Sequence, residues 1–152
     1  MDDFEKRINH LLTDTYKNVV KVEENMLKST QSPLSISEIH LLEAVGNAEG
    51  HTQTVSALAE TLDITTSSVT IAVGKLVRRG YLLKDKSPLD GRSVCITLTR
   101  EGEKIHRLHR YFHMKMVRSL VENFDEGERR ALLSGLEKLD KFFLEKVSET
   151  EA

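Results

Sequence analysis

Small hydroxyl side chains are concentrated between residues 65 and 70, just before a run of aliphatic residues. If this segment is helical, Val69, Val73 and Leu76 share one apolar face and small polar residues share the opposite face. Hydroxyls at a helix N-terminus can contact phosphates and base edges, and an isoleucine can contact a thymine methyl group. The pattern also fits a plain solvent-exposed helix face. The predicted contacts to double-stranded DNA are Thr66, Ser67, Ser68, Thr70, Ile71 and Lys75.

Asp90 and Arg92 are a second predicted DNA contact. They lie between two strand-like segments, 81–83 and 94–98, in a stretch that contains the turn residues Pro88 and Gly91. An arginine at a hairpin tip can enter the narrow minor groove, where the negative potential is concentrated, and an aspartate can hold its guanidinium in place. We assign Lys75 to a phosphate, and Arg78 and Arg79 mainly to solvent or to the helix dipole.

Three histidines share one face of a later helix, because His106, His109 and His113 follow at i, i+3 and i+7. Together with His40 they could bind a transition metal, since imidazole is a common ligand of such ions. Packing at a helix interface explains them at least as well, because no acidic or thiol ligand is expected to neighbour the set. The metal set His40, His106, His109 and His113 is therefore the weaker alternative, and no cofactor is expected.

The elements that position these residues follow from apolar periodicity and capping signals. Ser35-Ile36-Ser37-Glu38 predicts a capping box at one helix start, and Asp125 to Glu128 predicts another. Thr52, Thr65 or Thr66, and Thr99 are further predicted caps, and Gly80 is expected to end a helix. The predicted helices include residues 4–27, 36–45 and 100–122, with strands at 81–83 and 94–98. A further helix follows Thr52, another follows Thr65 or Thr66 and ends at Gly80, and the last follows Asp125. Their apolar residues are Val55, Leu58, Ala59 and Leu62 in the first, Val69, Val73 and Leu76 in the second, and Leu132, Leu136, Leu139 and Phe143 in the last.

The expected fold is mainly α with a small β-hairpin wing, a winged helix-turn-helix. We expect one domain over residues 1–152, with a winged-helix core at 34–99 and dimerisation helices at 4–30 and 100–147. The apolar stripes of the terminal helices include Phe4, Ile8, Leu136 and Phe143. One small chain cannot cover both stripes, so we expect a homodimer.

The wing carries the spacing D-x-R-x5-L-T, from Asp90-Gly91-Arg92 to Leu98-Thr99. This spacing, the chain length and the element order resemble those of MarR-type transcriptional regulators. The resemblance implies a ligand-responsive regulator, more often a repressor, that binds a pseudo-palindromic operator through the residues named above. Gly91 stands where this family often has a second arginine, which removes one charge from the wing tip.

A narrower resemblance rests on His106-Arg107-Leu108-His109-Arg110, Phe112-His113 and Val22-Glu23-Glu24. These segments look similar to the FabT-type branch of MarR regulators, which represses fatty-acid synthesis genes with acyl-acyl carrier protein as corepressor. The resemblance implies an apolar effector channel between the first helix and the long helix that begins at residue 100. Its expected residues are Met26, Ile39, His106, Leu108, His109 and Phe112. Apolar stripes of this kind are more often plain core.

Composition narrows the remaining function classes. The chain of 152 residues has a net charge of −2, but residues 66–92 carry six basic side chains against two acidic ones, a local charge of +4. A localised basic face is what phosphate binding needs. The acidic N-terminus and the lack of a long apolar run predict a cytoplasmic protein with no membrane contact. Cys95 is the single cysteine and is expected to be buried and inert.

Two other readings stay open. A metallohydrolase on the histidine face would need a carboxylate base or a nucleophile–base pair beside it, and the sequence offers none there, so we expect no enzyme. A winged helix can also act purely as a protein–protein interaction module, and the local positive charge argues against this without removing it. Within DNA binding, the alternative to a lipid-linked effector is a metal or another small molecule.

Overall fold

The computed structural model describes residues 1–29, 33–86 and 94–150. The chain separates into two compact units, Met1–His109 and Arg110–Ala152. The first unit contains α1 (Asp3–Ser29), α2 (Ile36–Gly46), the 3₁₀ turn Glu49–His51, β1 (Thr52–Thr54), α3 (Val55–Leu62), α4 (Thr66–Arg78), β2 (Leu82–Lys86), β3 (Val94–Leu98) and the start of α5 (Arg100–Val121). The second unit holds the rest of α5 and α6 (Glu126–Thr150). The predicted fold class is confirmed, and the single domain stays a prediction.

Helix starts were the most predictable part of the fold, because caps are encoded locally. Ser35 Oγ accepts the Glu38 N–H at 3.3 Å, and the Glu38 carboxylate accepts the Ser35 N–H at 2.9 Å. Asp125 and Glu128 form the same reciprocal pair at the start of α6. Thr99 caps α5 by accepting the Gly102 N–H at 3.1 Å. The predicted caps at Ser35, Asp125 and Thr99 are therefore confirmed.

Thr52 was expected to cap the helix that follows it, and this prediction is wrong. Residues Thr52–Thr54 form the strand β1, which pairs antiparallel with Cys95–Thr97 of β3. The cap is Thr54, whose hydroxyl accepts the Ala57 N–H at 3.1 Å. A pairing partner more than forty residues away leaves no local signal, so the strand was missed. The sheet order is β1-β3-β2, with both pairs antiparallel.

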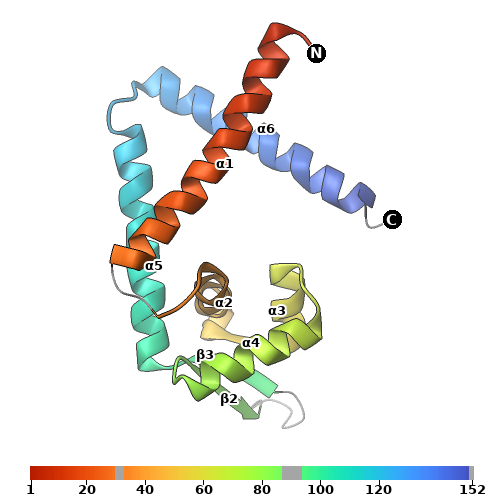
Figure 1. Ribbon diagram of the computed structural model, residues 1–152, viewed down its shortest axis with the longest axis vertical. Helices are drawn as coiled ribbons and strands as arrows, with labels where there is room; N and C mark the ends of the chain where they lie inside the picture. The colour runs from red at the N-terminus through yellow and green to blue at the C-terminus, as the bar shows by residue number, and fades with distance from the viewer. Residues whose placement is uncertain (30–32, 87–93, 151–152) are drawn as a thin grey trace. The chain divides into compact units, whose positions relative to one another are not determined.

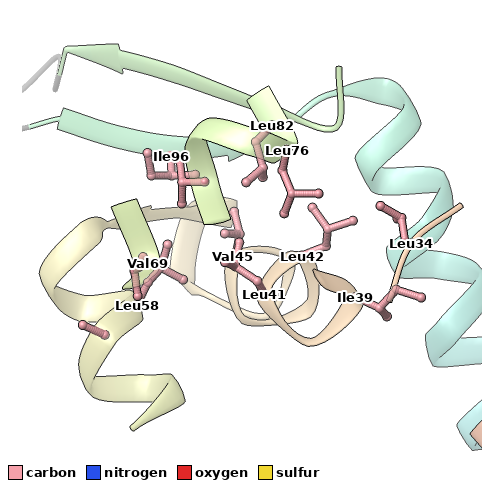
Figure 2. Packing of buried hydrophobic residues seen from close by; sticks show 12 residues of the cluster. Leu34, Ile39, Leu41, Leu42, Val45, Leu58, Val69, Leu76, Leu82 and Ile96 are labelled. Atoms are coloured by element: carbon pink, nitrogen blue, oxygen red, sulfur yellow. The ribbon is translucent and has the colours of Figure 1, made fainter. Parts of the chain in front are cut away.

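The core of the first unit lies where α2, α3 and α4 meet the sheet (Figure 1). Leucine, isoleucine and valine side chains from all three helices and from β2 and β3 point toward one another there (Figure 2). Leu42, Val45, Leu58, Val69, Leu76 and Ile96 are fully buried in this cluster. Burying each such side chain contributes roughly 1.5–3 kcal/mol, so this cluster sets the mutual orientation of the three helices.

Gly80 and Gly102 shape the connection between α4 and α5. Gly80 follows α4 with φ +79°, a left-handed conformation that glycine adopts without steric cost. Gly102 lies against the Tyr81 carbonyl, where a Cβ atom would collide with the backbone. Thr99 Oγ1 also donates to the Gly80 carbonyl at 2.7 Å. The start of α5 is therefore anchored directly to the end of α4. Among the described helices, none is long and apolar enough to cross a membrane.

Candidate nucleic-acid interface

The hydroxyl face predicted from the sequence forms the exposed N-terminal half of α4. Thr65 is the N-cap, and its hydroxyl accepts the Ser68 N–H at 3.2 Å. The same oxygen lies 2.9 Å from the hydroxyls of both Ser67 and Ser68. These hydroxyls are therefore gathered around the positive end of the helix dipole, which suits contact with a phosphate.

The two faces of α4 divide as expected. Val69, Val73 and Leu76 are at most 1% exposed and pack in the core. The side chain of Ile71, by contrast, is 74% exposed, although burying it would be favourable. All six predicted contacts on α4 are solvent-exposed: Thr66, Ser67, Ser68, Thr70, Ile71 and Lys75. Their contact with DNA stays a prediction.

The turn before α4 orients this face relative to α3. Asp63 ends α3 in the left-handed conformation, with φ 51° and ψ 48°, which Asp tolerates better than most residues. The Ile64 N–H then donates to the Ala59 carbonyl at 3.1 Å. A helix, a tight turn and a second helix with an exposed polar face make a helix-turn-helix, with α4 in the recognition position.

Glu38 of α2 holds the C-terminal part of α4 in place. Its Oε1 accepts from Lys75 Nζ at 2.7 Å and from Arg79 Nη1 at 2.9 Å. Arg79 Nη2 also donates to the Pro33 carbonyl at 2.7 Å. The assignment of Arg79 to solvent or the helix dipole is therefore wrong, because its guanidinium links α4 to α2. Lys75 remains 57% exposed, but its charge is already paired with a carboxylate.

Two opposing effects act on the pKa of Glu38. Burial alone would raise it, but hydrogen bonds from Lys75, the Ser35 backbone and Arg79, with the charge of Arg79, lower it to about 2 from the usual 4.5. The carboxylate therefore stays ionised at neutral pH and keeps both cations. No sequence signal marked Glu38 as more than a capping-box residue, since its partners lie about 40 positions away.

The wing is described only in part. β2 and β3 are paired from Leu82 with Leu98 to Lys86 with Val94, and Lys84 and Lys86 are exposed. Asp90 and Arg92, the two predicted wing contacts, lie outside the described residues, as does Gly91. Cys95 is half-buried in β3, so the expectation of full burial is wrong.

The predicted effector residues have different environments. Ile39 is 3% exposed and belongs to the core cluster, whereas Leu108 is 43% exposed. Met26 is half-buried on α1, and His106 and His109 are buried. Phe112, which is half-buried, belongs to the second unit. The placement of Ile39 favours a packing role, and the effector channel stays a prediction.

The predicted metal set is divided by the structure. His106 Nε2 donates a hydrogen bond to Asn47 Oδ1 at 3.0 Å. The imidazole ring of His106 packs against Gly46, where a side chain would collide with it. His40 and His109 instead lie beside Glu43, with ligand atoms of all three within 4.8 Å of one another. The expectation that no acidic ligand neighbours the histidines is therefore wrong, because Glu43 lies beside His40 and His109. Glu43 was missed, although it follows His40 by three residues on the same helix face.

Residues 32–93 match the MarR family. The uncharacterized HTH-type transcriptional regulator YhjH of Bacillus subtilis is 31% identical over 104 residues, which are 68% of this chain. The chain spans only 58% of the length of that relative.

Solved structures match over almost the whole chain. Streptococcus pneumoniae FabT, solved in complex with DNA, is 34% identical with a TM-score of 0.87, and the match covers 93% of this chain and 98% of FabT. A MarR family protein from Bacillus stearothermophilus has a TM-score of 0.78 with 20% identity, covering 95% of this chain and 99% of its own. The second match supports the fold alone.

Proposed function

Because this chain belongs to the MarR family of DNA-binding transcriptional regulators, and so is not an enzyme, we propose that it represses fatty-acid synthesis genes as an operator-bound homodimer. The observation that carries the DNA-binding part of this proposal is the exposed face of α4. Its hydroxyls and Ile71 face solvent, while Val69, Val73 and Leu76 fix the opposite face in the core. The 34% identity with Streptococcus pneumoniae FabT, which was solved in complex with DNA, supports DNA binding by this chain.

In this proposal α4 enters the major groove. The hydroxyls of Ser67 and Ser68 contact phosphates or base edges, and Ile71 contacts a thymine methyl group. Arg92 of the wing reaches the adjacent minor groove. Two copies related by a two-fold axis would then read half-sites about one helical turn apart, in a pseudo-palindromic operator.

The homodimer is supported by apolar side chains that the single chain leaves exposed. On α1, Phe4 is 73% exposed and Ile8 is 40% exposed. On α6, Leu136 and Phe143 are each 52% exposed. Apolar stripes of this length are costly in water, and a second copy of the chain would cover them.

Acyl-acyl carrier protein is the proposed corepressor. The resemblance of the segments around His106 and Glu23 to the FabT-type branch supports this choice. A corepressor that binds the DNA-competent conformation more tightly can raise operator affinity by at most the ratio of its affinities for the two conformations. The residues that would hold the acyl chain stay a prediction.

The test is a fluorescence-anisotropy titration of the protein on its own promoter DNA at two salt concentrations. A scrambled duplex controls for sequence specificity, and unacylated carrier protein controls for the acyl chain. We expect specific binding that weakens with salt and tightens at least fivefold with the long-chain acylated form. Specific binding that ignores the acyl chain would overturn the corepressor. Absence of DNA binding at low salt would favour a protein–protein interaction module.

A further inference from the structure

Two histidines and a glutamate form a cluster on α2 and the start of α5, away from the exposed face of α4. His40 and Glu43 are one turn apart on α2, and His109 approaches them from α5. His109 Nδ1 lies 3.5 Å from Glu43 Oε2, and the His40 and His109 ring centroids are 5.8 Å apart. His40, Glu43, His109 and the nearby Glu23 all belong to the first unit.

Burial makes this cluster different from a surface ion pair. The side chain of His109 is 3% exposed and that of Glu43 is 29% exposed, whereas His40 is 44% exposed at the rim. Glu23 of α1 is buried, at 6% exposed, and its Oε2 lies 3.9 Å from His40 Nε2. Carboxylates are seldom buried without a cation or strong hydrogen bonds beside them. Two carboxylates therefore converge on two imidazoles, with His109 and Glu23 buried and His40 at the rim.

The donor set suits a transition metal. Neutral imidazole nitrogens and carboxylate oxygens bind Zn²⁺ at about 2.0–2.2 Å, which puts ligand atoms about 3.4 Å apart around a tetrahedral ion. The ligand atoms of His40, Glu43 and His109 lie within 4.8 Å of one another, so shifts of about 1 Å would close the shell. The imidazoles disfavour Mg²⁺ and Ca²⁺, which prefer oxygen ligands alone.

The surroundings leave room for the remaining ligand. A concavity of about 480 Å³ opens beside the cluster and is lined by His40 and Glu43 together with Ala44 and Asn47. A water molecule from this concavity, or the Glu23 carboxylate, would complete four-coordination. The half-exposed ring of His40 gives an ion a path to the buried nitrogen of His109.

We propose that His40, Glu43 and His109 bind Zn²⁺, with Glu23 beside them as a further carboxylate. The second half of the inference rests on the proposed function: zinc at this site changes operator affinity. The physical link is α2, because Glu38 on the same helix holds Lys75 and Arg79 of α4. An ion that ties α2 to α5 acts on the helix that positions α4.

The binding test uses chelator-treated full-length protein and Zn²⁺ alone, followed by calorimetry, with Co²⁺ absorption reporting imidazole coordination. We expect one ion per chain in the wild type. His40→Ala and Glu43→Gln should each weaken zinc binding at least about 100-fold. The reason is that loss of a direct ligand lowers metal affinity at least as much as loss of a residue that only supports a ligand. His10→Ala is the matched control, since His10 is exposed on α1 beside Asp14 and should leave binding unchanged.

Variants are compared only after their circular dichroism and urea unfolding match those of the wild type. The buried His109 is left intact, so a folding failure cannot imitate a lost ligand. Absence of zinc binding at micromolar concentration overturns the site. Binding that His40→Ala and Glu43→Gln leave unchanged overturns it equally.

The regulatory half is tested on promoter DNA with and without saturating Zn²⁺. A change of at least fivefold in operator affinity, absent in His40→Ala, supports it, and an unchanged affinity overturns it. The two proposals fail separately. A protein that binds its operator but no zinc contradicts only this inference, whereas one that binds zinc but no DNA contradicts only the proposed function.

Discussion

Lys75 of α4 donates to Glu38 of α2 across 2.7 Å, and this pair ties the exposed helix α4 to the protein core. Arg79 donates to the same carboxylate oxygen at 2.9 Å. The pair positions α4 by a charge interaction in addition to the apolar packing of Val69 and Leu76. A phosphate that contacts Lys75 would share its ammonium group with Glu38, because the ammonium has three N–H donors.

Replacing Glu38 by Gln should lower stability at neutral pH by about 1–2 kcal/mol, since the two cations lose their partner. The pKa of Glu38 is about 2 in the folded protein and 4.5 ordinarily, so its contribution is full above pH 4.5. The contribution disappears as pH falls from 4.5 toward 2. Urea unfolding between pH 7 and pH 2.5 should show wild type and variant converging in acid.

Glu101→Gln is the control for this experiment. Glu101 forms an exposed pair with Lys104 at 3.9 Å on α5, and such pairs contribute little. Its stability should stay within about 0.5 kcal/mol of the wild type at every pH. A constant difference between wild type and Glu38→Gln across the whole pH range would contradict the ion-pair account.

Gly46→Ala should destabilise the protein by about 1–3 kcal/mol. A Cβ atom at this position would lie 2.6 Å from Nδ1 of His106, whose ring also holds Asn47 through Nε2. The ring or the start of α5 must move. Gly135→Ala on α6 is the matched control, because its Cβ would meet nothing within 4 Å. Gly135→Ala should raise the free energy of unfolding by about 0.5–1 kcal/mol. If thermal unfolding showed the same change in stability for Gly46→Ala and Gly135→Ala, the packing argument would be refuted.

Ile71→Ala should weaken operator binding three- to tenfold without changing the free energy of unfolding, because the side chain is 74% exposed. The proposed partner is a thymine methyl group, which uracil lacks. Substituting uracil for thymine at each operator position in turn should reduce wild-type affinity at one position per half-site. The variant should be insensitive to that same substitution. If uracil substitution weakens both proteins equally, Ile71 does not read a methyl group.

Arg92→Ala should weaken DNA binding and reduce the slope of log affinity against log salt by about one. The reason is that the Arg92 side chain, when it enters the groove, releases counterions from the DNA, and the variant no longer does so. Lys104→Ala, an exposed lysine of α5 paired with Glu101, serves as control and should change neither quantity. An unchanged affinity and slope for Arg92→Ala would remove the wing arginine from the mechanism.

Much of the fold was predictable because its signals are local. The capping pairs Ser35 with Glu38 and Asp125 with Glu128 were readable from four residues each, and apolar periodicity placed Val69 and Leu76 on the inner face of α4. The missed elements depended on distant partners. β1 exists because Thr52–Thr54 pairs with β3, and Arg79 is occupied because Glu38 reaches it from another helix.

The candidate zinc site shows the same division. His106, His109 and His113 stood out on one helix face, and their spacing alone suggested that they act together. The structure instead places His106 against Gly46 and Asn47, and brings His109 to Glu43 and His40. Helical spacing says which residues share a face, but the packing partner decides which of them meet acidic ligands.

By itself, the sequence determined the order of the elements, the helix caps and the exposed hydroxyl face of α4, because these depend on interactions within a few residues. Only the tertiary structure decided which charged groups meet. Lys75 and Arg79 converge on Glu38, and His40 and Glu43 meet His109, across 37 to 69 positions of chain. Such pairs form because the buried apolar cluster fixes the helices against one another, and no local pattern encodes that arrangement.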